Sequence, residues 1–169
     1  MENLELIYES KNIYYVKMSE YLLDEYLKMY NDIEIQKLLF RKIFTKEQIA
    51  SWINKQIHDK NVHVYSMIEK STNEYIGNFE IIIKENNVAE ILLSITSNKQ
   101  NKHYGTESIK AMIDFSTQEF NIDEFELYVK SDNHRAIHCY ENIGFTKSGP
   151  GITEDDIHMS YNNKIIKKL

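Results

Sequence analysis

Apolar residues recur along this chain with two periods, one typical of strands and one typical of helices. Runs of β-forming residues predict strands over 62–68, 75–84, 88–95 and 125–129, with one or two short strands in 4–18 and a last strand that includes 157–161. Apolar positions three and four residues apart predict helices over 22–30, 45–57, 106–120 and 134–143. The pattern therefore predicts alternating strands and helices along most of the chain.

Two of these helices carry capping signals at their ends. Thr45 and Gln48 have the spacing of a capping box, in which the hydroxyl and the side-chain amide satisfy exposed backbone N–H groups. Asn133 suits the cap of the helix that follows it. Gly144 suits the left-handed position that commonly follows a helix end.

The order of the elements predicts the fold class. Hairpins come in the first half and crossover helices in the second, which indicates a central mixed sheet, mostly antiparallel, flanked by helices on both faces. No linker or internal repeat divides the sequence, so we expect one α/β domain over residues 1–169. Ligands bind at the carboxyl ends of parallel strands, which makes the loop after Ile95 the expected site.

Composition narrows the functional classes. The chain is 42% hydrophobic and 27% charged, which is typical of a globular protein. Its formal net charge of −6 argues against a nucleic-acid-binding protein, which needs a basic face. The apolar runs are too short to cross a membrane, and the N-terminus is unlike a secretory signal. A single cysteine, Cys139, excludes an internal disulfide. We therefore expect a cytoplasmic protein.

The loop QNKHYGTES, residues 100–108, joins an apolar strand to an amphipathic helix. The start of that helix offers unpaired N–H groups and the positive end of the helix dipole. Lys102 adds a cation, and Gly105 lets the backbone approach a ligand closely. These features favour an anion or phosphate site. The loop contains neither GxxxxGK[ST] nor GxGxxG, so an ordinary strand-to-helix connection is the alternative.

The same loop resembles motif A of the Gcn5-related N-acetyltransferases (GNAT), which reads Q/R-x-x-G-x-G/A. Gln100 and Gly105 fill defined positions of that motif. His103 stands where the motif has a glycine, and Asn101 stands where many members have another. We expect the backbone of His103 to keep a right-handed conformation, so that its Cβ is tolerated.

A second segment, NHRAIHCYENIGF, resembles motif B of the same family, N-x-x-A-x-x-x-Y-E-x-x-G-F. Every defined position matches, namely Asn133, Ala136, Tyr140, Glu141, Gly144 and Phe145. An amphipathic helix with a glycine stop would explain motif B alone, but the two motifs occur in the family's order within compatible elements. The N-terminal part resembles the RimJ/RimL-like branch, which includes protein N-terminal and spermidine acetyltransferases.

The resemblance implies an N-acetyltransferase that transfers acetyl directly from acetyl-CoA to an amine in a ternary complex. The loop would hold the pyrophosphate of CoA, and strand 88–95 would bond the pantetheine arm like an added strand. An amide near Ser94 or Ile95 would polarise the thioester carbonyl. The residues implied at the cofactor site are Ser94, Ile95, Gln100, Asn101, Lys102, His103, Tyr104, Gly105, Thr106, Asn133 and Tyr140.

Direct transfer to an amine needs a group that takes the acceptor's proton and an acid for the departing thiolate. Glu90 lies in an otherwise apolar strand, where family members often carry a glutamate, and is the first candidate for a catalytic or acceptor-binding role. Glu80 in the neighbouring strand is the second candidate. Tyr140 matches the tyrosine that acts as general acid in many members. The alternatives for Glu90 are a strand-end position that faces solvent or a pairing with a lysine. The alternative for Tyr140 is a core position with its hydroxyl bonded to backbone.

Helix 134–143 carries two histidines and a cysteine that could in principle bind a metal or act as a nucleophile. His134 and His138 have the spacing of metal ligands on a helix, but no third ligand accompanies them. Cys139 points away from both around the helix, and no Cys–His–Asn arrangement can be argued. We expect neither a metal site nor a cysteine nucleophile.

The sequence does not identify the acceptor amine. A polyamine, an amino sugar, an antibiotic and a protein N-terminus are all compatible with the family resemblance. The helices within 22–57 are expected to shape the acceptor pocket. A homodimer is expected because dimers are common in the family. The alternative function is a non-catalytic acyl-CoA-binding or regulatory module on the same fold.

Overall fold

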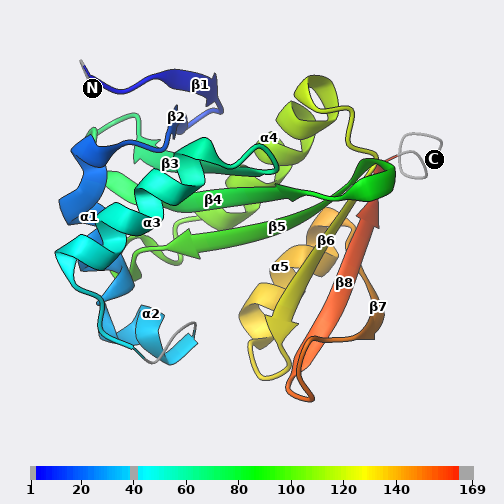
Figure 1. Ribbon diagram of the computed structural model, residues 1–169. Coiled ribbons are helices and arrows are strands. Elements are labelled where there is room, and N and C mark those ends of the chain that lie inside the picture. Colours follow the sequence, from blue (N-terminus) through cyan, green and yellow to red (C-terminus); the bar gives the residue numbers. More distant parts are fainter. Residues whose placement is uncertain (1–2, 39–41, 164–169) are drawn as a thin grey trace.

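The computed structural model describes residues 3–38 and 42–163, so both ends of the expected 1–169 domain lie outside the described residues. One eight-stranded sheet has the order β1-β2-β3-β4-β5-β6-β8-β7 (Figure 1). Every neighbouring pair is antiparallel except β5 and β6, which confirms the mixed, mostly antiparallel sheet. The strands are β1 (Leu6–Glu9), β2 (Ile13–Lys17), β3 (Val62–Glu69), β4 (Tyr75–Ile83), β5 (Val88–Ile95), β6 (Glu124–Lys130), β7 (Thr146–Pro150) and β8 (Asp156–Asn162).

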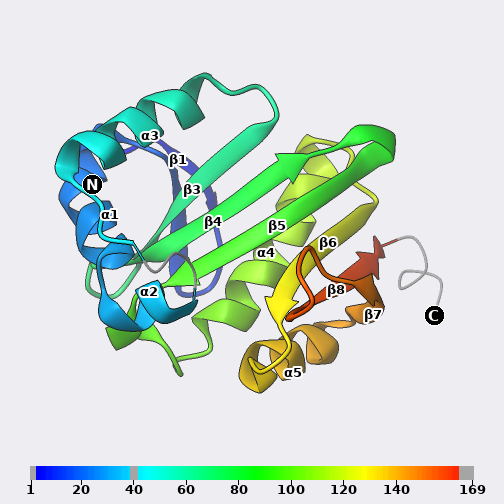
Figure 2. The same cartoon turned by 60° about the horizontal axis from the view of Figure 1, so that its bottom comes forward.

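Helices cover both faces of this sheet, as expected (Figure 2). The longer helices are α1 (Leu23–Tyr30), α3 (Lys46–His58), α4 (Tyr104–Glu119) and α5 (His134–Ile143). One apolar cluster joins α1 and α3 to one face of the sheet, through residues such as Tyr26, Ile53 and Val64. A larger cluster joins α4 and α5 to the other face, through residues such as Met112 and Phe125.

The capping signals act as the sequence predicts. Thr45 and Gln48 form the complete capping box at the start of α3. The Asn133 side chain accepts a hydrogen bond from the Ala136 amide at the start of α5. Gly144 follows that helix with a φ of 117°, a conformation that glycine adopts without steric cost.

Three features differ from the sequence prediction. Strand β7 was not expected, because its sequence TKSGP lacks apolar alternation; all of its residues are exposed, and it forms by pairing with β8 at the edge of the sheet. The short helix α2 (Ile33–Leu38) was also missed, because six residues are too few for a periodic signal. Helix α4 begins at Tyr104 rather than at Thr106.

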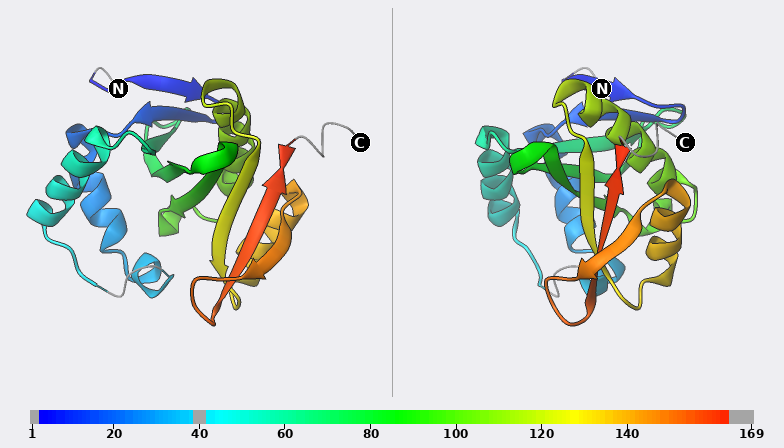
Figure 3. Two further views of the ribbon diagram at one scale, coloured as in Figure 1. Left: turned by 45° about the vertical axis from the view of Figure 1, so that its right-hand side comes forward. Right: turned by 90° about the vertical axis from the view of Figure 1, so that its right-hand side faces the viewer.

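The sheet opens between its two parallel strands. Residues 88–90 of β5 pair with residues 124–126 of β6, and the pairing then ends. Beyond this β5–β6 seam the two strands diverge, so that β6, β8 and β7 turn away from the first five strands (Figure 3). None of the helices in the described ranges has the length and apolar character needed to cross a bilayer.

Candidate active site

Beyond residue 90, the edge of β5 that faces β6 has no strand paired with it in the described residues. We call it the open edge of β5. The Thr96 amide bonds a carbonyl of β4 at 2.9 Å, so backbone alternation directs the Ser94 amide toward β4 as well. The Ile95 backbone faces the opposite side, where its carbonyl accepts a bond from the Gln100 side chain at 3.1 Å. Of these two amides, that of Ile95 therefore points to the open edge and that of Ser94 points to β4.

The loop before α4 has a backbone that the sequence analysis did not anticipate. His103 has a φ of 64° and a ψ of 4°, which is left-handed, so the right-handed conformation expected for it is wrong. Asn101 is also left-handed, with a φ of 62°. Asn and His are among the non-glycine residues most often found in this region. A glycine at position 103 would adopt the same turn without cost, which explains why motif A has glycine there.

Helix α4 starts without a side-chain cap. His103 occupies the cap position and makes no side-chain hydrogen bond there, whereas Thr45 and Asn133 cap α3 and α5. Four N–H groups at a helix start have no intrahelical partner, and the helix dipole adds positive potential. The backbone between Lys102 and Thr106 thus has the character of an anion site.

A buried ionic cluster anchors the two ends of this loop. Lys99, with only 4% of its surface exposed, pairs with Glu69 at 2.6 Å and also with Glu74. The Tyr104 hydroxyl donates to Glu69, so the Tyr104 side chain belongs to the cluster, and only its amide faces the loop. Bonds from Lys99, Thr72 and Tyr104 lower the pKa of Glu69 to about 2, which keeps it ionised.

Arg135 on α5 contacts the loop, and the sequence analysis missed it. Its guanidinium donates to Asn101 Oδ1 at 2.9 Å and to Gln100 Oε1 at 2.8 Å. Thr106 Oγ1 lies 3.1 Å from Cys139 Sγ, which is a second contact between the start of α4 and α5. Arg135 occupies an undefined position of motif B, so only its place inside that motif could have signalled a role.

Tyr140 lies on α5 beside the apolar cluster under α4. Its ring centroid is 5.9 Å from that of Phe145. Burial raises the pKa of its hydroxyl to about 12, so the hydroxyl keeps its proton at neutral pH. Within 3–38 and 42–163 no hydrogen-bond partner of this hydroxyl is found, so it remains able to donate a proton to a ligand.

The other reactive side chains of α5 do not form a second site. His134 and His138 are exposed. No group of three potential metal-ligating side chains occurs in the described part of the chain. The Cys139 thiol contacts Thr106 rather than a histidine.

Comparison with known proteins places the chain in a family. The model of the acetyltransferase (GNAT) domain matches residues 13–146. The chain belongs to the GNAT family of acetyltransferases. It is thus an N-acetyltransferase that uses acetyl-CoA, and the open β5 edge with the uncapped α4 start suits that cosubstrate.

Individual relatives of this acetyltransferase are moderately similar. The uncharacterized N-acetyltransferase p20 of Bacillus licheniformis is 27% identical over 132 residues, covering 75% of this chain and 74% of that protein. The spermidine N(1)-acetyltransferase of Vibrio cholerae is 28% identical over 117 residues, covering 68% and 67%. The crystal structure of Vibrio cholerae spermidine N-acetyltransferase with CoA and spermine matches with a TM-score of 0.83 at 22% identity, over 92% of this chain and 98% of that one, and shows the same fold.

Two glutamates of this GNAT acetyltransferase lie on one sheet face near the seam. Glu80 on β4 is opposite Leu92 of β5, and Glu90 is opposite Ile82, so the two carboxylates are diagonal neighbours. Burial raises the pKa of Glu80 to about 7, and a hydrogen bond from the Tyr30 hydroxyl offsets part of that effect. No ion pair of Glu80 is found within the described ranges.

Glu90 has different surroundings from Glu80. Its carboxylate lies 2.7 Å from the Lys84 ammonium, which also contacts Glu126 of β6. Glu126 in turn lies 3.1 Å from His158. The pairing with a lysine considered as an alternative for Glu90 is therefore present, and Glu90 belongs to a charged group at the end of the seam.

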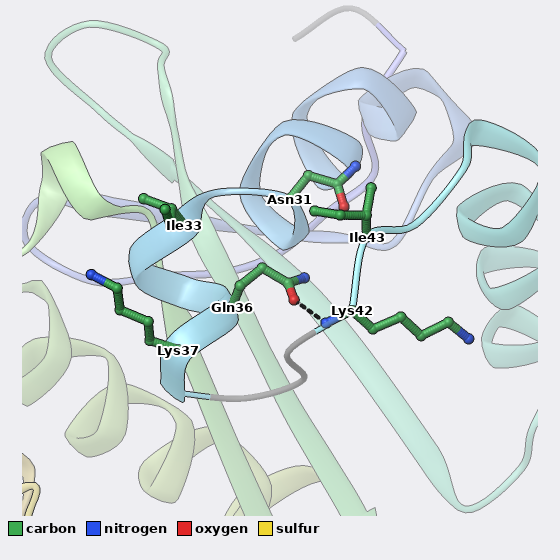
Figure 4. Close-up of a pocket in the computed structure, with 6 residues that line it drawn as sticks. All are labelled: Asn31, Ile33, Gln36, Lys37, Lys42 and Ile43. Carbon is green, nitrogen blue, oxygen red and sulfur yellow. Dashed lines mark hydrogen bonds between the residues drawn. The ribbon is translucent and has the colours of Figure 1, made fainter.

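A pocket lies beside α2, lined by Asn31, Ile33, Gln36, Lys37, Lys42 and Ile43 (Figure 4). Its two amides are structural, because Gln36 bonds the Lys42 amide and Asn31 bonds the Phe44 backbone. Asp32, which precedes α2, accepts a bond from Ser97 at 2.7 Å and so ties this region to the carboxyl end of β5. The segment expected to shape the acceptor pocket thus contacts the residues that follow β5, and residues 39–41 lie outside the described residues.

Proposed function

We propose that this acetyltransferase acetylates a polyamine or a related alkylamine that carries more than one positive charge. The polyamine option draws support from the spermidine acetyltransferases among its relatives. Glu80, Glu90 and Glu126 lie on one sheet face near the β5–β6 seam and would attract a cationic acceptor. We also propose that, within the GNAT family, the chain belongs to the RimJ/RimL-like branch.

We propose the following roles on the donor side. The open edge of β5 bonds the pantetheine arm, and the loop with the start of α4 bonds the pyrophosphate through backbone amides. The Ile95 amide polarises the thioester carbonyl. Lys102 adds positive charge. The side-chain oxygen of Asn133 accepts the capping hydrogen bond from the Ala136 amide. A contact between Asn133 and CoA would therefore use its NH₂ group.

The transfer itself is direct. The neutral amine attacks the thioester carbonyl, the carbon–sulfur bond breaks, and the departing thiolate takes a proton from Tyr140. The nitrogen of the new amide loses its second proton, which returns to the Tyr140 phenolate through solvent. Glu80 takes the proton from the acceptor ammonium, because a base with a pKa of about 7 suits transfer at neutral pH. Glu90, held by Lys84, binds and orients the acceptor ammonium. The competing assignment gives the proton transfer to Glu90.

The acceptor proposal is tested by measuring thiol release from acetyl-CoA with a panel of amines. Spermidine, spermine, putrescine, glucosamine, an aminoglycoside and N-terminal peptides cover the alternatives. We expect the highest kcat/KM with spermidine or spermine. A preference for N-terminal peptides or amino sugars would contradict the polyamine proposal, and CoA binding without thiol release would contradict catalysis.

Two substitutions test the catalytic assignments. Tyr140→Phe should lower kcat about 100-fold, in the range expected for loss of a general acid, with CoA affinity unchanged. Glu90→Gln should mainly raise the KM of the amine if Glu90 binds the acceptor. A fall in kcat alone for Glu90→Gln would favour Glu90 as the base.

The assembly and location expected from the sequence remain proposals. We propose a homodimer, which sedimentation velocity at micromolar concentration would test, and a single sedimenting monomer would contradict it. We also propose a cytoplasmic location, which cell fractionation would test.

A further inference from the structure

Arg135 links helix α5 to the loop before α4 by two hydrogen bonds. Nη1 is 2.9 Å from Asn101 Oδ1, and Nη2 is 2.8 Å from Gln100 Oε1. A planar guanidinium that uses two nitrogens at once fixes the orientation of both partners, which a lysine ammonium cannot do equally well. Both partners belong to the candidate pyrophosphate loop.

The two residues that Arg135 holds are coupled to the rest of the site. Gln100 donates through its Nε2 to the Ile95 carbonyl at 3.1 Å, at the open edge of β5. Asn101 has a left-handed backbone with a φ of 62°, a conformation that needs support from its surroundings. A continuous set of bonds therefore runs from α5 through the loop to β5.

The positive charge of Arg135 is not neutralised by these contacts. Both acceptors are neutral amide oxygens, and no ion pair of Arg135 is found in the described part of the chain. A carboxylate at position 100 or 101 would cancel this charge beside an anion site. The amide partners fix the guanidinium and leave its field available to a phosphate.

Helix α5 also carries Tyr140, the candidate acid for the departing thiolate. The Thr106–Cys139 contact of 3.1 Å is a second link between this helix and the start of α4. Helix α5 thus contacts the loop through Arg135 and the start of α4 through Cys139.

We propose that Arg135 is a positioning residue for the donor substrate. It holds Gln100 and Asn101 in the conformation in which the loop receives the pyrophosphate of acetyl-CoA. This inference rests on the proposed function, in which the loop binds that pyrophosphate.

The test compares Arg135→Met, Arg135→Lys and a charge-matched control, Lys110→Met, which removes an exposed cation of α4. CoA affinity is measured by calorimetry, and kinetics are measured with acetyl-CoA and with S-acetyl-pantetheine, which lacks the pyrophosphate. We expect Arg135→Met to weaken CoA binding about tenfold, the effect of losing a charge-assisted bond. Arg135→Lys should show a smaller loss, and the control should bind as the wild type does.

The donor without pyrophosphate separates positioning from a general structural effect. Arg135→Met should leave kcat at saturating acetyl-CoA within about twofold, since chemistry at Tyr140 is unchanged. Its kcat/KM for S-acetyl-pantetheine should equal that of the wild type. Equal losses with both donors, or unchanged CoA affinity, would overturn the proposal.

A double-mutant cycle tests whether Arg135 acts through the loop. Asn101→Ala alone should also weaken CoA binding, and Asn101→Ala with Arg135→Met should lose little more than Arg135→Met alone. Fully additive losses would show that Arg135 binds a phosphate independently, which contradicts positioning. If the wild type itself binds no CoA, the proposed function fails first. Wild-type binding with an unaffected Arg135→Met rejects this inference alone.

Discussion

At the scale of single residues, burial and backbone conformation decide what a side chain can do. Glu80 and Glu90 are both glutamates on one sheet face, yet their surroundings differ: burial raises the pKa of Glu80 to about 7, whereas Glu90 is paired with Lys84. The same contrast holds in the loop, where His103 fills a left-handed position through its backbone and leaves its side chain exposed. Each of these differences predicts a measurable effect.

The pKa of Glu80 predicts the pH dependence of activity. If Glu80 is the base, kcat/KM for the amine should show an additional loss as the pH falls through about 7, because the protonated carboxyl cannot accept a proton. Glu80→Gln should be about 100-fold less active at pH 8 and should lack this transition. A wild-type profile without the transition, or a variant that keeps it, would contradict the assignment.

The same pKa predicts the pH dependence of stability. The folded-state pKa of Glu80 lies above its ordinary value of 4.5, so the folded protein binds more protons between those two values. The free energy of unfolding contributed by Glu80 is therefore highest at low pH and is lost as the pH rises toward 7. Relative to the wild type, Glu80→Gln should gain stability at pH 8 and not at pH 4.5. Urea titrations at both pH values measure this difference.

The backbone of His103 predicts how the loop responds to substitution. A β-branched residue is strongly disfavoured at a φ of 64°, so His103→Val should lose about 1–2 kcal/mol of stability and should weaken CoA binding. His103→Gly relieves the strain at some entropic cost, and CoA affinity should change less than about tenfold. Calorimetric CoA titration of both variants tests this, and equal affinities for Val and Gly would contradict it.

At the scale of elements, the pairing of β4 with β5 positions the open edge of β5. Gly77 of β4 pairs with Ile95, and a Cβ at Gly77 would lie only 1.9 Å from the Ser94 carbonyl oxygen. Its φ of 158° is also rarely adopted by other residues. The position of the open edge of β5 therefore depends on a glycine in the neighbouring strand, outside both sequence motifs.

Substitution of Gly77 should disturb this edge. Gly77→Ala should cost about 3 kcal/mol or more, because the clash is with backbone that cannot move independently. Gly149→Ala is a matched control on strand β7, where the added Cβ would lie 3.9 Å from His158 Nδ1 in ordinary contact. Thermal unfolding of both variants measures the difference, and equal melting temperatures would contradict the close approach.

At the scale of the whole molecule, the short β5–β6 seam joins the two halves of the sheet. It ends at Glu90 and Glu126, two carboxylates in register on neighbouring strands, which would repel each other without a cation. Lys84 extends from the end of β4 and contacts both. Burial alone would raise the pKa of Glu126, but Lys84 and His158 outweigh that effect and lower it.

Removal of this cation should weaken the seam in a pH-dependent way. Lys84→Met should cost about 1 kcal/mol at pH 8, where the repulsion between the carboxylates is no longer offset. It should cost less at pH 5, because without Lys84 burial would raise the pKa of Glu126 and favour its protonation. Lys17→Met removes an exposed ion pair between Lys17 of β2 and Glu5, which precedes β1, and should cost little at either pH. A loss for Lys84→Met that is equal at both pH values would contradict this account.

Local signals in the sequence predicted much of the molecule because they act over a few residues. The capping box at Thr45, the cap at Asn133 and the glycine at position 144 all have the predicted roles. The strand Val88–Ile95 was predicted with its observed bounds, because it is a continuous run of apolar residues with one acid. Motifs A and B also identified the family, which the GNAT domain match over residues 13–146 confirms.

Only the tertiary structure decided the features that depend on distant neighbours. The bonds of Arg135 to Gln100 and Asn101 and the ion pair of Lys84 with Glu126 join elements far apart in the chain. The burial of Glu80 likewise depends on the groups that pack around it. Strand β7 has no apolar pattern and exists because β8 offers an edge. Periodicity and capping report local free energies, whereas a pKa or a bridging hydrogen bond depends on which groups the fold brings together.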